Sequence, residues 1–369
     1  MKVDILTMHA ARNYGAVLQA YALQNVIENH FGYSAEIVNY VSTQRSNYRY
    51  FTKVIDRLKH SHLKSMIYLA AIFPTRLYAQ IIFKKFVRKH LNLSKQKASN
   101  SEELKKLNLD ADIFCAGSDQ IWNPVHNDGL DGGFFLDFVQ KDKRKISYAS
   151  SIGTSELTQT QKSQMKELLS DFYAISYREY STKNIFNDLE IEGEWVLDPT
   201  LLLDQSDWHS IAANKKLPSD YLLLYWFGNP KSIMTEAKRI AKERNLKIVR
   251  ISTILRKYKN DEIVEYFPSP ERFIQLFENA KFVITNSFHG TAFSINFNKQ
   301  FYSKPAKQND DRFYNLFKMF DIFDRDILEK FKPLSDNDIS YGKINKRLDE
   351  MRNISYGFLE KSLIQEQQE

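Results

Sequence analysis

Cysteine is nearly absent from this chain of 369 residues, in which Cys115 is the only one. A disulfide framework and a Cys-rich metal site are therefore excluded, because each needs at least two thiols. Cys115 lies in the apolar run from Ile113 to Ala116, which predicts a small buried residue of a hydrophobic core.

Long apolar stretches without charge are also missing. Asp4 interrupts the first apolar stretch and no basic region precedes it, so no secretory signal is expected. No run of about 18 apolar residues is free of charge, so this pattern excludes a membrane-spanning helix. The apolar fraction of 43% and the charged fraction of 26% are typical of a soluble globular protein. A cytoplasmic protein is expected.

Acidic residues are scarce in one segment. From Arg45 to Lys95 the chain has twelve Lys and Arg and a single acid, Asp56, so this segment carries +11 while the whole chain carries +7. The cations alternate with large apolar residues, namely Phe51, Ile55, Leu58, Ile67, Tyr68, Phe73, Tyr78, Ile82, Phe83 and Phe86. Two interpretations stay open: helices in peripheral contact with an anionic membrane, or an amphipathic insertion with a solvated basic face. No recognition motif for nucleic acid is present, so that partner is not expected.

The length favours two domains, and the pattern of apolar residues predicts alternating strands and helices. A strand at 3–8, a helix that ends at Gly32 and a strand at 36–40 predict a βαβ unit, which joins parallel strands. Further strands are predicted at 111–116, 145–150, 173–177, 194–197, 221–227, 247–251 and 281–285. The fold class is therefore α/β, with a Rossmann-like domain at 1–205 that contains a basic helical insertion at about 45–97. A second Rossmann-like domain is predicted at 206–343, and a helix at 344–369 that packs back on the first.

Polar side chains follow many of these strands directly. They are Asn13, Tyr14, Ser118, Asp119, Ser151, Arg178, Asp198 and His289. Doubly wound sheets bind their ligands outside the carboxyl ends of the strands. The sequence therefore predicts a cleft that these side chains line.

Six segments follow one another along the chain. They begin at Asn13-Tyr14-Gly15-Ala16, Gly117-Ser118-Asp119-Gln120, Tyr148-Ala149-Ser150-Ser151, Ser176-Tyr177-Arg178-Glu179, Leu197-Asp198-Pro199-Thr200 and Asn286-Ser287-Phe288-His289. In this order they resemble the polysaccharide pyruvyl transferase family. The resemblance implies two Rossmann-like domains that face each other across a cleft, as in GT-B glycosyltransferases. It also implies a bacterial enzyme that moves pyruvate from phosphoenolpyruvate to a glycan or lipid-linked glycan in cell-surface or exopolysaccharide biosynthesis. No cofactor and no metal are expected.

The donor site is expected around His289, at the start of a short helix whose free backbone N–H groups favour an anion. Ser287, Gly290 and Thr291 flank this histidine, which the resemblance makes a phosphate ligand or an acid–base group. Arg178 is expected to grip a carboxylate or phosphate of the donor, with a salt bridge to Glu179 as the alternative. Arg312 is a further candidate for anion binding.

On the acceptor side, Asp119 is the candidate base, and its alternative role is to cap a helix that contains Trp122. Asn13, Tyr14, Ser118 and Trp122 are candidate acceptor ligands, although Asn13 also suits a helix cap and Trp122 a buried anchor. Asp198 in Asp198-Pro199-Thr200 is interpreted as structural. Replacing His289 or Arg178 by Ala is expected to lower turnover at least ~100-fold and to leave the fold intact.

Two other functions remain open at this stage. A nucleotide-sugar glycosyltransferase would share the two-domain plan, but the expected pair of Glu residues for ribose binding is missing, and Glu271 and Glu278 are only a near match. The second alternative is a member of the family that binds a glycan or a membrane without turnover.

Overall fold

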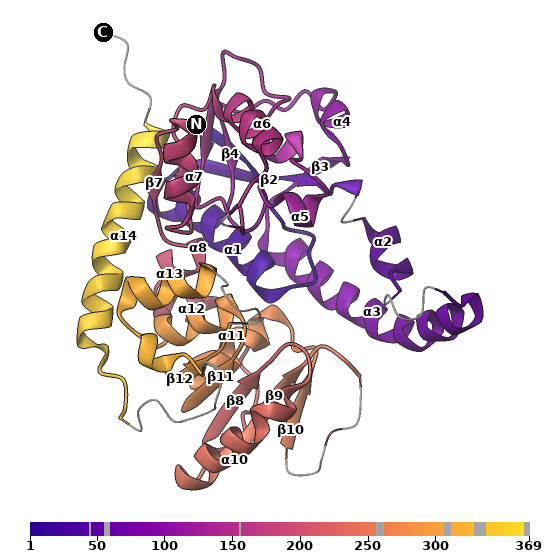
Figure 1. Ribbon diagram of the computed structural model, residues 1–369, viewed down its shortest axis with the longest axis vertical. Coiled ribbons are helices and arrows are strands. Elements are labelled where there is room, and N and C mark those ends of the chain that lie inside the picture. Colours follow the sequence, from indigo (N-terminus) through magenta and orange to yellow (C-terminus); the bar gives the residue numbers. More distant parts are fainter. Residues whose placement is uncertain are drawn as a thin grey trace.

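The computed structural model describes residues 1–43, 46–54, 60–154, 156–255, 258, 262–305, 311–327 and 337–364. Two α/β halves lie one above the other, and a long helix, α14, runs beside both of them (Figure 1). A second long helix, α3, extends away from the body of the molecule.

The first half is built on a parallel sheet with the order β3-β2-β1-β4-β5. Its strands are β1 (Lys2–Leu6), β2 (Ser34–Tyr40), β3 (Leu93–Ala98), β4 (Ile113–Ala116) and β5 (Arg144–Ser147). Isolated bridges continue it towards β6 (Ser176–Tyr177), which pairs with β7 (Glu194–Trp195). The strand order reverses between β1 and β4, and ligands of doubly wound sheets bind at such reversals.

The second half repeats this arrangement. Its parallel sheet has the order β10-β9-β8-β11-β12. The strands are β8 (Tyr221–Tyr225), β9 (Lys247–Ser252), β10 (Glu262–Tyr266), β11 (Phe282–Thr285) and β12 (Gln300–Ser303). Every residue of β8 is buried, as expected of a parallel strand with helices on both faces. The structure confirms an α/β chain with two Rossmann-like halves, whereas the boundary at 205/206 stays a prediction.

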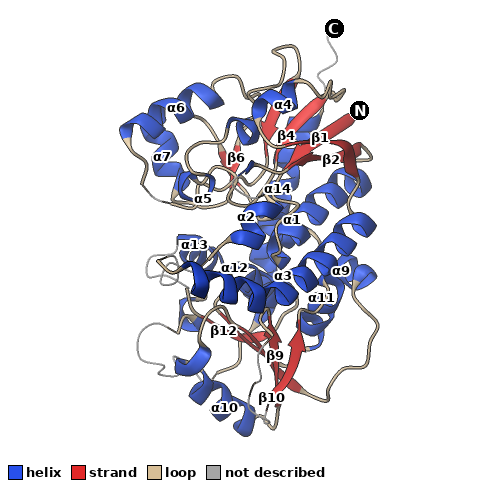
Figure 2. Cartoon of the chain, turned by 90° about the vertical axis from the view of Figure 1, so that its right-hand side faces the viewer, coloured by secondary structure: helices blue, strands red, loops and turns tan. Residues whose placement is uncertain are grey.

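The helices of the described residues connect and cover the two sheets (Figures 1 and 2). They are α1 (Tyr14–Asn25), α2 (Asn47–Thr52), α3 (His62–His90), α4 (Ser101–Lys105), α5 (Pro124–Asn127), α6 (Gln159–Leu169), α7 (Thr182–Leu189), α8 (Pro199–Leu202), α9 (Gln205–Ile211), α10 (Met234–Glu243), α11 (Pro270–Asn279), α12 (Phe288–Asn296), α13 (Asp311–Phe320) and α14 (Tyr341–Leu363). A π-helix, Val26–His30, continues α1 towards Gly32, so the predicted first helix changes its hydrogen-bond pattern before it ends.

One hydrophobic core joins the two halves. It contains strand residues of both sheets, such as Ile5 and Val283. Tyr14, at the start of α1, crosses between them: its ring stacks on Phe273 of α11 with 4.3 Å between ring centroids. The Tyr14 hydroxyl donates a 2.8 Å hydrogen bond to the carbonyl of Pro268. Apolar contact therefore fixes the two halves against each other at this point.

Helix α14 returns to the first half, as the sequence predicts. The Ser355 hydroxyl accepts a 3.0 Å hydrogen bond from the backbone of Leu197, and Arg352 donates to the carbonyl of Leu201 at 2.8 Å. Near the end of the helix, the carbonyl of Ser362 accepts a 3.2 Å hydrogen bond from Arg144, beside β5. These contacts confirm that the C-terminal helix packs back on the first domain.

The segment that the sequence marks as a basic insertion contains α2 and α3 and reaches the edge strand β3. Phe83 and Phe86, in the second half of α3, are buried in the core, so this part of the helix is the crossover from β2 to β3. Its first half is different, because Leu63, Met66 and Ile67 are 61% to 70% exposed. Arg45, Ile55 and Leu58 of the predicted segment lie outside the described residues.

Helix α3 also corrects the exclusion of a spanning helix. Of the helices that the structure describes, this one is long and apolar enough to cross a membrane, and only 22% of its most apolar window is buried. The sequence argument demanded a run without any charge. The apolar stretch of α3, which includes Pro74, contains one cation, Arg76, and so did not meet this condition. Length and composition alone are weak support for a membrane span.

Candidate functional site

The carboxyl ends of three neighbouring strands of the first half form the floor of the site. Beyond β4, β5 and β6, single bridges pair Asp119 with Ser150 and Ser150 with Tyr177. The backbone N–H of Ser151 donates a 3.0 Å hydrogen bond to the carbonyl of Asp119. Arg178 follows Tyr177 directly. The predicted polar residues after these strands therefore lie side by side.

Arg178 is the buried cation of this site, with 4% of its surface exposed. Its Nε donates to Glu179 Oε1 and its Nη1 to Asp198 Oδ2, both at 2.8 Å. Burial alone would lower the pKa of Arg178, but the carboxylates of Glu179, Asp198 and Asp119 raise it above its ordinary value. The guanidinium is therefore a permanent positive charge, held in one orientation by two carboxylates.

One amine of Arg178 remains available to a ligand. Nη2 is buried without a hydrogen-bond partner among the described residues, and it lies 3.8 Å from Asp119 Oδ1. The guanidinium also lies over the ring of Phe288, with 4.6 Å to the ring centroid. The salt bridge to Glu179, which the sequence gave as the alternative, is present, and the donor-binding role of Arg178 stays a prediction.

Asp198 links Arg178 to the second half of the molecule. One oxygen caps α8, since Oδ1 accepts hydrogen bonds from the backbone N–H of Thr200 at 3.0 Å and from its hydroxyl at 2.7 Å. The other oxygen, Oδ2, accepts the hydrogen bond from Arg178 Nη1 and lies 3.7 Å from His289 Nε2. Burial would raise the pKa of Asp198, but His289 and Arg178 lower it below its ordinary value.

The interpretation of Asp198 as purely structural is therefore incomplete. Its cap on α8 is as expected, because Pro199 occupies the first turn of that helix and Asp is a common cap. The ionic contacts were not predicted, since they join residues 20 and 91 positions away. The only signal in the sequence was its position directly after a strand, among the other candidate residues.

His289 comes from the second half, in the first turn of α12. Ser287 caps this helix by accepting a 3.3 Å hydrogen bond from the N–H of Gly290. The imidazole reaches across to the first half, where it packs on Gly15 so closely that a Cβ at that position would lie 1.8 Å from Nδ1. His289 Nε2 is buried with no hydrogen-bond partner among the described residues. The structure thus brings His289 beside Arg178, with Nε2 3.7 Å from the Asp198 carboxylate that also binds Arg178.

The residues around His289 have mainly structural contacts. A Cβ on Gly290 would lie 2.3 Å from Thr285 Oγ1, so glycine allows α12 to approach β11. Thr291 is fully buried, and its hydroxyl hydrogen-bonds the carbonyl of Ser287 at 3.1 Å and the hydroxyl of Ser303 at 2.6 Å. The Thr291 hydroxyl is therefore used within the fold, and the donor-binding role of Ser287, Gly290 and Thr291 stays a prediction.

Arg312 lies in the first turn of α13, three residues before Asn315. Asn315 accepts a 2.8 Å hydrogen bond from the backbone of Tyr180, two residues after Arg178. Residues three apart share one side of a helix, so Arg312 belongs to the side of α13 that approaches the site. Its donor-binding role stays a prediction.

Two acceptor-side expectations need correction at the β4 end. Trp122 is fully buried, donates to the carbonyl of Phe134 at 3.2 Å and stacks on Phe135, so it is the buried anchor and not a surface for a sugar. Asp119 does not cap a helix that contains Trp122, because Asn123 caps α5 and Trp122 precedes it. Asp119 instead has φ = 72°, a left-handed conformation that is uncommon for residues other than glycine.

The remaining acceptor candidates divide into buried and exposed residues. Tyr14 is 1% exposed and joins the two halves, and Ser118 is fully buried with its hydroxyl 3.3 Å from Asp198 Oδ2. Neither side chain can contact an acceptor in this arrangement. Asn13 caps α1, as its alternative predicted, and its exposed side chain also lines a cavity.

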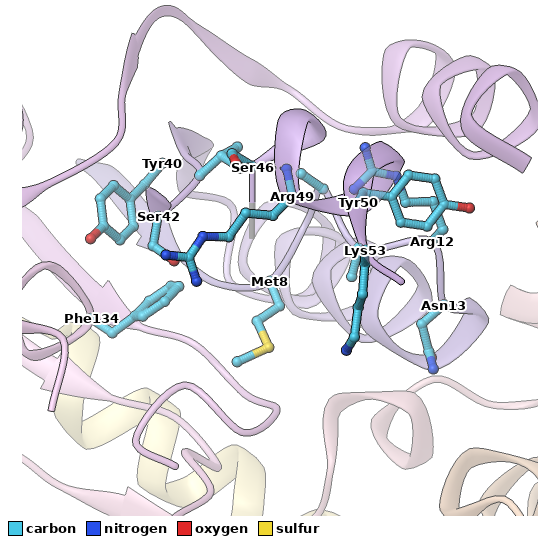
Figure 3. Close-up of a pocket in the computed structure, with 13 residues that line it drawn as sticks. Met8, Arg12, Asn13, Tyr40, Ser42, Ser46, Arg49, Tyr50, Lys53 and Phe134 are labelled. Carbon is cyan, nitrogen blue, oxygen red and sulfur yellow. Dashed lines mark hydrogen bonds between the residues drawn. The ribbon is translucent and has the colours of Figure 1, made fainter. Parts of the chain in front are cut away.

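This cavity, of about 290 Å³, lies between α2 and the loop from β1 to α1 (Figure 3). We call it the α2 pocket. It is lined by Met8, Ala10, Ala11, Arg12, Asn13, Tyr40, Val41, Ser42, Ser46, Arg49, Tyr50, Lys53 and Phe134. Sequence reasoning assigned Arg49 and Lys53 to the basic segment, did not single out Arg12, and did not place these cations at the carboxyl ends of β1 and β2.

The two Glu residues that a nucleotide-sugar enzyme might have used are both occupied in α11. Glu271 lies 3.1 Å from His90 Nε2, and Glu278 lies 2.6 Å from His209 Nδ1. Burial raises the pKa of Glu271, but the hydrogen bond from His90 and others lower it to about 2 overall. In the part of the chain that the structure describes, no three metal-ligating side chains gather around a common point.

A comparison with family models gives one match: the model of the polysaccharide pyruvyl transferases matches residues 13–304. No curated protein sequence matches this chain significantly. Among solved structures, a putative UDP-N-acetylglucosamine 2-epimerase from Listeria monocytogenes aligns with a TM-score of 0.50, 9% identity and coverage of 98% of this chain and 90% of that one. A UDP-GlcNAc 2-epimerase from Neisseria meningitidis aligns with a TM-score of 0.49, 9% identity and coverage of 99% and 95%. At 9% identity, the likeness to the Listeria monocytogenes structure shows the GT-B type of fold alone.

Proposed function

The chain belongs to the polysaccharide pyruvyl transferase family, and on this premise we propose that it transfers pyruvate from phosphoenolpyruvate to sugar hydroxyls of a cell-surface glycan, with formation of a ketal. One observation supports the proposal most directly. Arg178 Nη2 and His289 Nε2 are both buried and without hydrogen-bond partners among the described residues, and Asp198 lies next to both side chains.

Phosphoenolpyruvate carries a phosphate and a carboxylate, and the site offers hydrogen-bond donors for each of these two groups. The guanidinium of Arg178 suits a planar carboxylate or a phosphate. The first turn of α12 leaves backbone N–H groups that favour a phosphate, and His289 lies in that turn. Asp198 keeps both side chains oriented before the donor arrives, which reduces the ordering that binding would otherwise require.

The chemistry needs an acid and a base on opposite sides of the donor. In the proposed reaction His289 protonates C3 of the enol, and the electron pair of the C2–C3 double bond forms the new C–H bond. A sugar hydroxyl then bonds to the electrophilic C2 and loses its proton to Asp119, whose side chain is 15% exposed. The C2–O bond to phosphate breaks, and phosphate leaves with the electron pair. A second hydroxyl bonds to C2 and releases its proton, which closes the ketal.

The test is the dependence of phosphate release on an acceptor. Purified protein is incubated with phosphoenolpyruvate and with glycan extracted from the producing cells, and both free phosphate and the methyl signal of a pyruvate ketal are followed. We expect both products only when glycan and donor are present, and neither with His289→Ala. Release of a nucleotide from a nucleotide sugar, without any reaction of phosphoenolpyruvate, would contradict the proposal in favour of a glycosyltransferase.

The same experiment separates the non-catalytic alternative, since such a protein would bind glycan without releasing phosphate. Against the glycosyltransferase alternative, Glu271 and Glu278 are paired with His90 and His209 on α11. To serve a ribose, both carboxylates would first have to leave these partners.

We further propose that the enzyme contacts an anionic membrane through the exposed part of α3. Leu63, Met66, Ile67, Phe73 and Leu77 follow the three- and four-residue spacing of one helix face, and each is at least 41% exposed. Lys64 and the cations of the surrounding segment would attract anionic headgroups, with about 1 kcal/mol for each Lys or Arg near the surface. Phe83 and Phe86 cannot take part, because they are core residues.

Flotation with vesicles tests this contact. We expect more protein to float with anionic than with neutral lipid, and less after Met66, Ile67 and Phe73 are changed together to Ser. Replacing Lys84, Lys85, Arg88 and Lys89 together by Gln should weaken the salt-sensitive part of binding, because screening shortens to about 3 Å at 1 M salt. Equal recovery from both lipids would refute the membrane contact and leave the reaction untouched.

A further inference from the structure

We propose that the α2 pocket binds a phosphate or diphosphate group of the acceptor, a role that rests on the proposed transfer to a glycan. The pocket is separate from the donor site, because its lining residues lie between Met8 and Phe134 and include none of Arg178, Asp198 and His289. The two sites would therefore hold the two substrates at separate places.

Charge is the first argument. Arg12, Arg49 and Lys53 line the pocket, and no Asp or Glu of the described residues lines it. Figure 3 shows the side chains of Arg49 and Lys53 leaving α2 on the side where Met8 and Asn13 lie. Three cations around a space of about 290 Å³ favour an anion with several charges, and phosphate groups meet that requirement better than a neutral sugar.

The cations are held in place by the fold. Arg12 donates from Nε to Gln80 at 2.5 Å, and its guanidinium lies over the ring of Tyr50 with 4.2 Å to the ring centroid. Helix α2, which carries Arg49, is fixed to α3 because Arg76 donates to the carbonyls of Phe51 at 2.8 Å and Lys53 at 2.7 Å. The backbone and side chains that carry these cations are therefore already held in position, so binding of an anion costs little conformational entropy.

The remaining walls suit a sugar. Tyr50 provides a partly exposed aromatic ring, whereas Tyr40 and Phe134 are buried behind the lining, and the exposed Asn13 provides an amide group. The volume is at the small end of the range for small-molecule sites, about 300 to 1,000 Å³, so it fits one phosphorylated sugar unit and not a long oligosaccharide.

The position of the pocket connects it to the proposed reaction. Asn13, which caps α1, lines the pocket, and Gly15, two residues later, contacts the imidazole of His289. Consecutive residues are 3.8 Å apart between Cα atoms, so the α2 pocket begins within about 8 Å of the backbone against which His289 packs. A sugar held by its phosphate in the pocket would extend towards the donor.

Such a phosphate could belong to a lipid diphosphate or to a nucleoside diphosphate, and the test distinguishes them. Titration calorimetry with inorganic pyrophosphate, in the presence of saturating phosphoenolpyruvate, measures the shared chemistry. Farnesyl diphosphate below its micelle concentration and UDP then form the second and third arms. Tighter binding of farnesyl diphosphate than of UDP would indicate a lipid carrier, and the reverse order a nucleotide.

The variant Arg49→Gln with Lys53→Gln should weaken pyrophosphate binding at least ten-fold. Lys64→Gln removes a cation of α3 that lies outside the pocket, and pyrophosphate binding should stay within two-fold of the wild type. Equal weakening in both variants would show general charge attraction and overturn the proposal, as would unchanged binding in the double variant. Phosphoenolpyruvate affinity is measured separately without pyrophosphate. If the wild type does not bind phosphoenolpyruvate, the proposed reaction is refuted. The comparison of the variants with pyrophosphate would still report on the pocket.

Discussion

The contact between Gly15 and His289 leads to a double-variant experiment on the donor site. A Cβ at position 15 would lie 1.8 Å from His289 Nδ1 and 2.2 Å from Cγ, far inside van der Waals contact. The backbone of α1 is packed in the core, whereas the imidazole can rotate about two side-chain bonds. Gly15→Ala should therefore displace the imidazole from Asp198 and leave α1 in place.

The expected magnitude follows from the interaction that is lost. A hydrogen bond to a charged group contributes about 1.5–3 kcal/mol, so losing the one between His289 and the bound donor should weaken binding about ten- to hundred-fold. Gly15→Ala should show a similar loss. The two changes act on one interaction, so the double variant should bind no more weakly than His289→Ala alone. Within helices Ala is favoured over Gly by up to about 1 kcal/mol, so unfolding should not become easier through helix propensity.

Calorimetric titration of each protein with phosphoenolpyruvate measures these affinities and needs no acceptor. Unfolding curves of the same samples serve as the control for folding. Wild-type affinity in Gly15→Ala would mean that the imidazole moves without consequence, and additive losses in the double variant would mean that position 15 acts independently of His289. Either result would refute the reasoning.

Three further predictions concern stability. Arg178→Ala should lower the free energy of unfolding in denaturant by about 3–5 kcal/mol, because it leaves Glu179 and Asp198 buried without their cation. The earlier expectation that this variant leaves the fold intact is therefore withdrawn. A change below about 1 kcal/mol would contradict the ionic network. Burial lowers the pKa of His9 from 6.5 to about 4, so the free energy of unfolding should fall by up to about 3 kcal/mol as the pH drops from about 6.5 to 4. Thermal unfolding of His9→Gln should show a shallower fall over this pH range. The same fall in the wild type and in the variant would refute this assignment. Trp122→Ala should lower the free energy of unfolding by about 3–5 kcal/mol, whereas an effect on glycan binding without loss of stability would restore its role as a sugar platform.

The sequence predicted nine of the twelve strands that the structure describes and missed β3, β10 and β12. Buried parallel strands are short apolar runs, and Asp119, Arg178 and His289 each follow such a run, so their convergence is a consequence of topology. The roles of buried residues were harder to predict. Tyr14 and Trp122 combine an apolar ring with a polar tip, and nothing local distinguishes a ring that stacks on a sugar from one that stacks on Phe273 or Phe135.

Asp198 illustrates a different limit. Its cap on α8 is a local contact that a short motif reveals, whereas its contacts with Arg178 and His289 depend on how two sheets are placed against each other. The α2 pocket was missed for the same reason, since Arg12 and Arg49 are far apart in sequence and meet only at the ends of β1 and β2. Helix α3 shows that a strict rule on charge can fail when one Arg lies within a long apolar helix.

The shared core between the two halves constrains how such enzymes can be recombined. Tyr14 inserts its ring among Phe83, Phe273 and Tyr225, which come from both halves, and its hydroxyl is bonded to Pro268. A chimera that joins the first half of this chain to the second half of a relative would break these contacts unless the partners of Tyr14 were exchanged with it. The two halves are therefore not separately portable modules: a graft that keeps these contacts has to transfer α11 together with the start of α1.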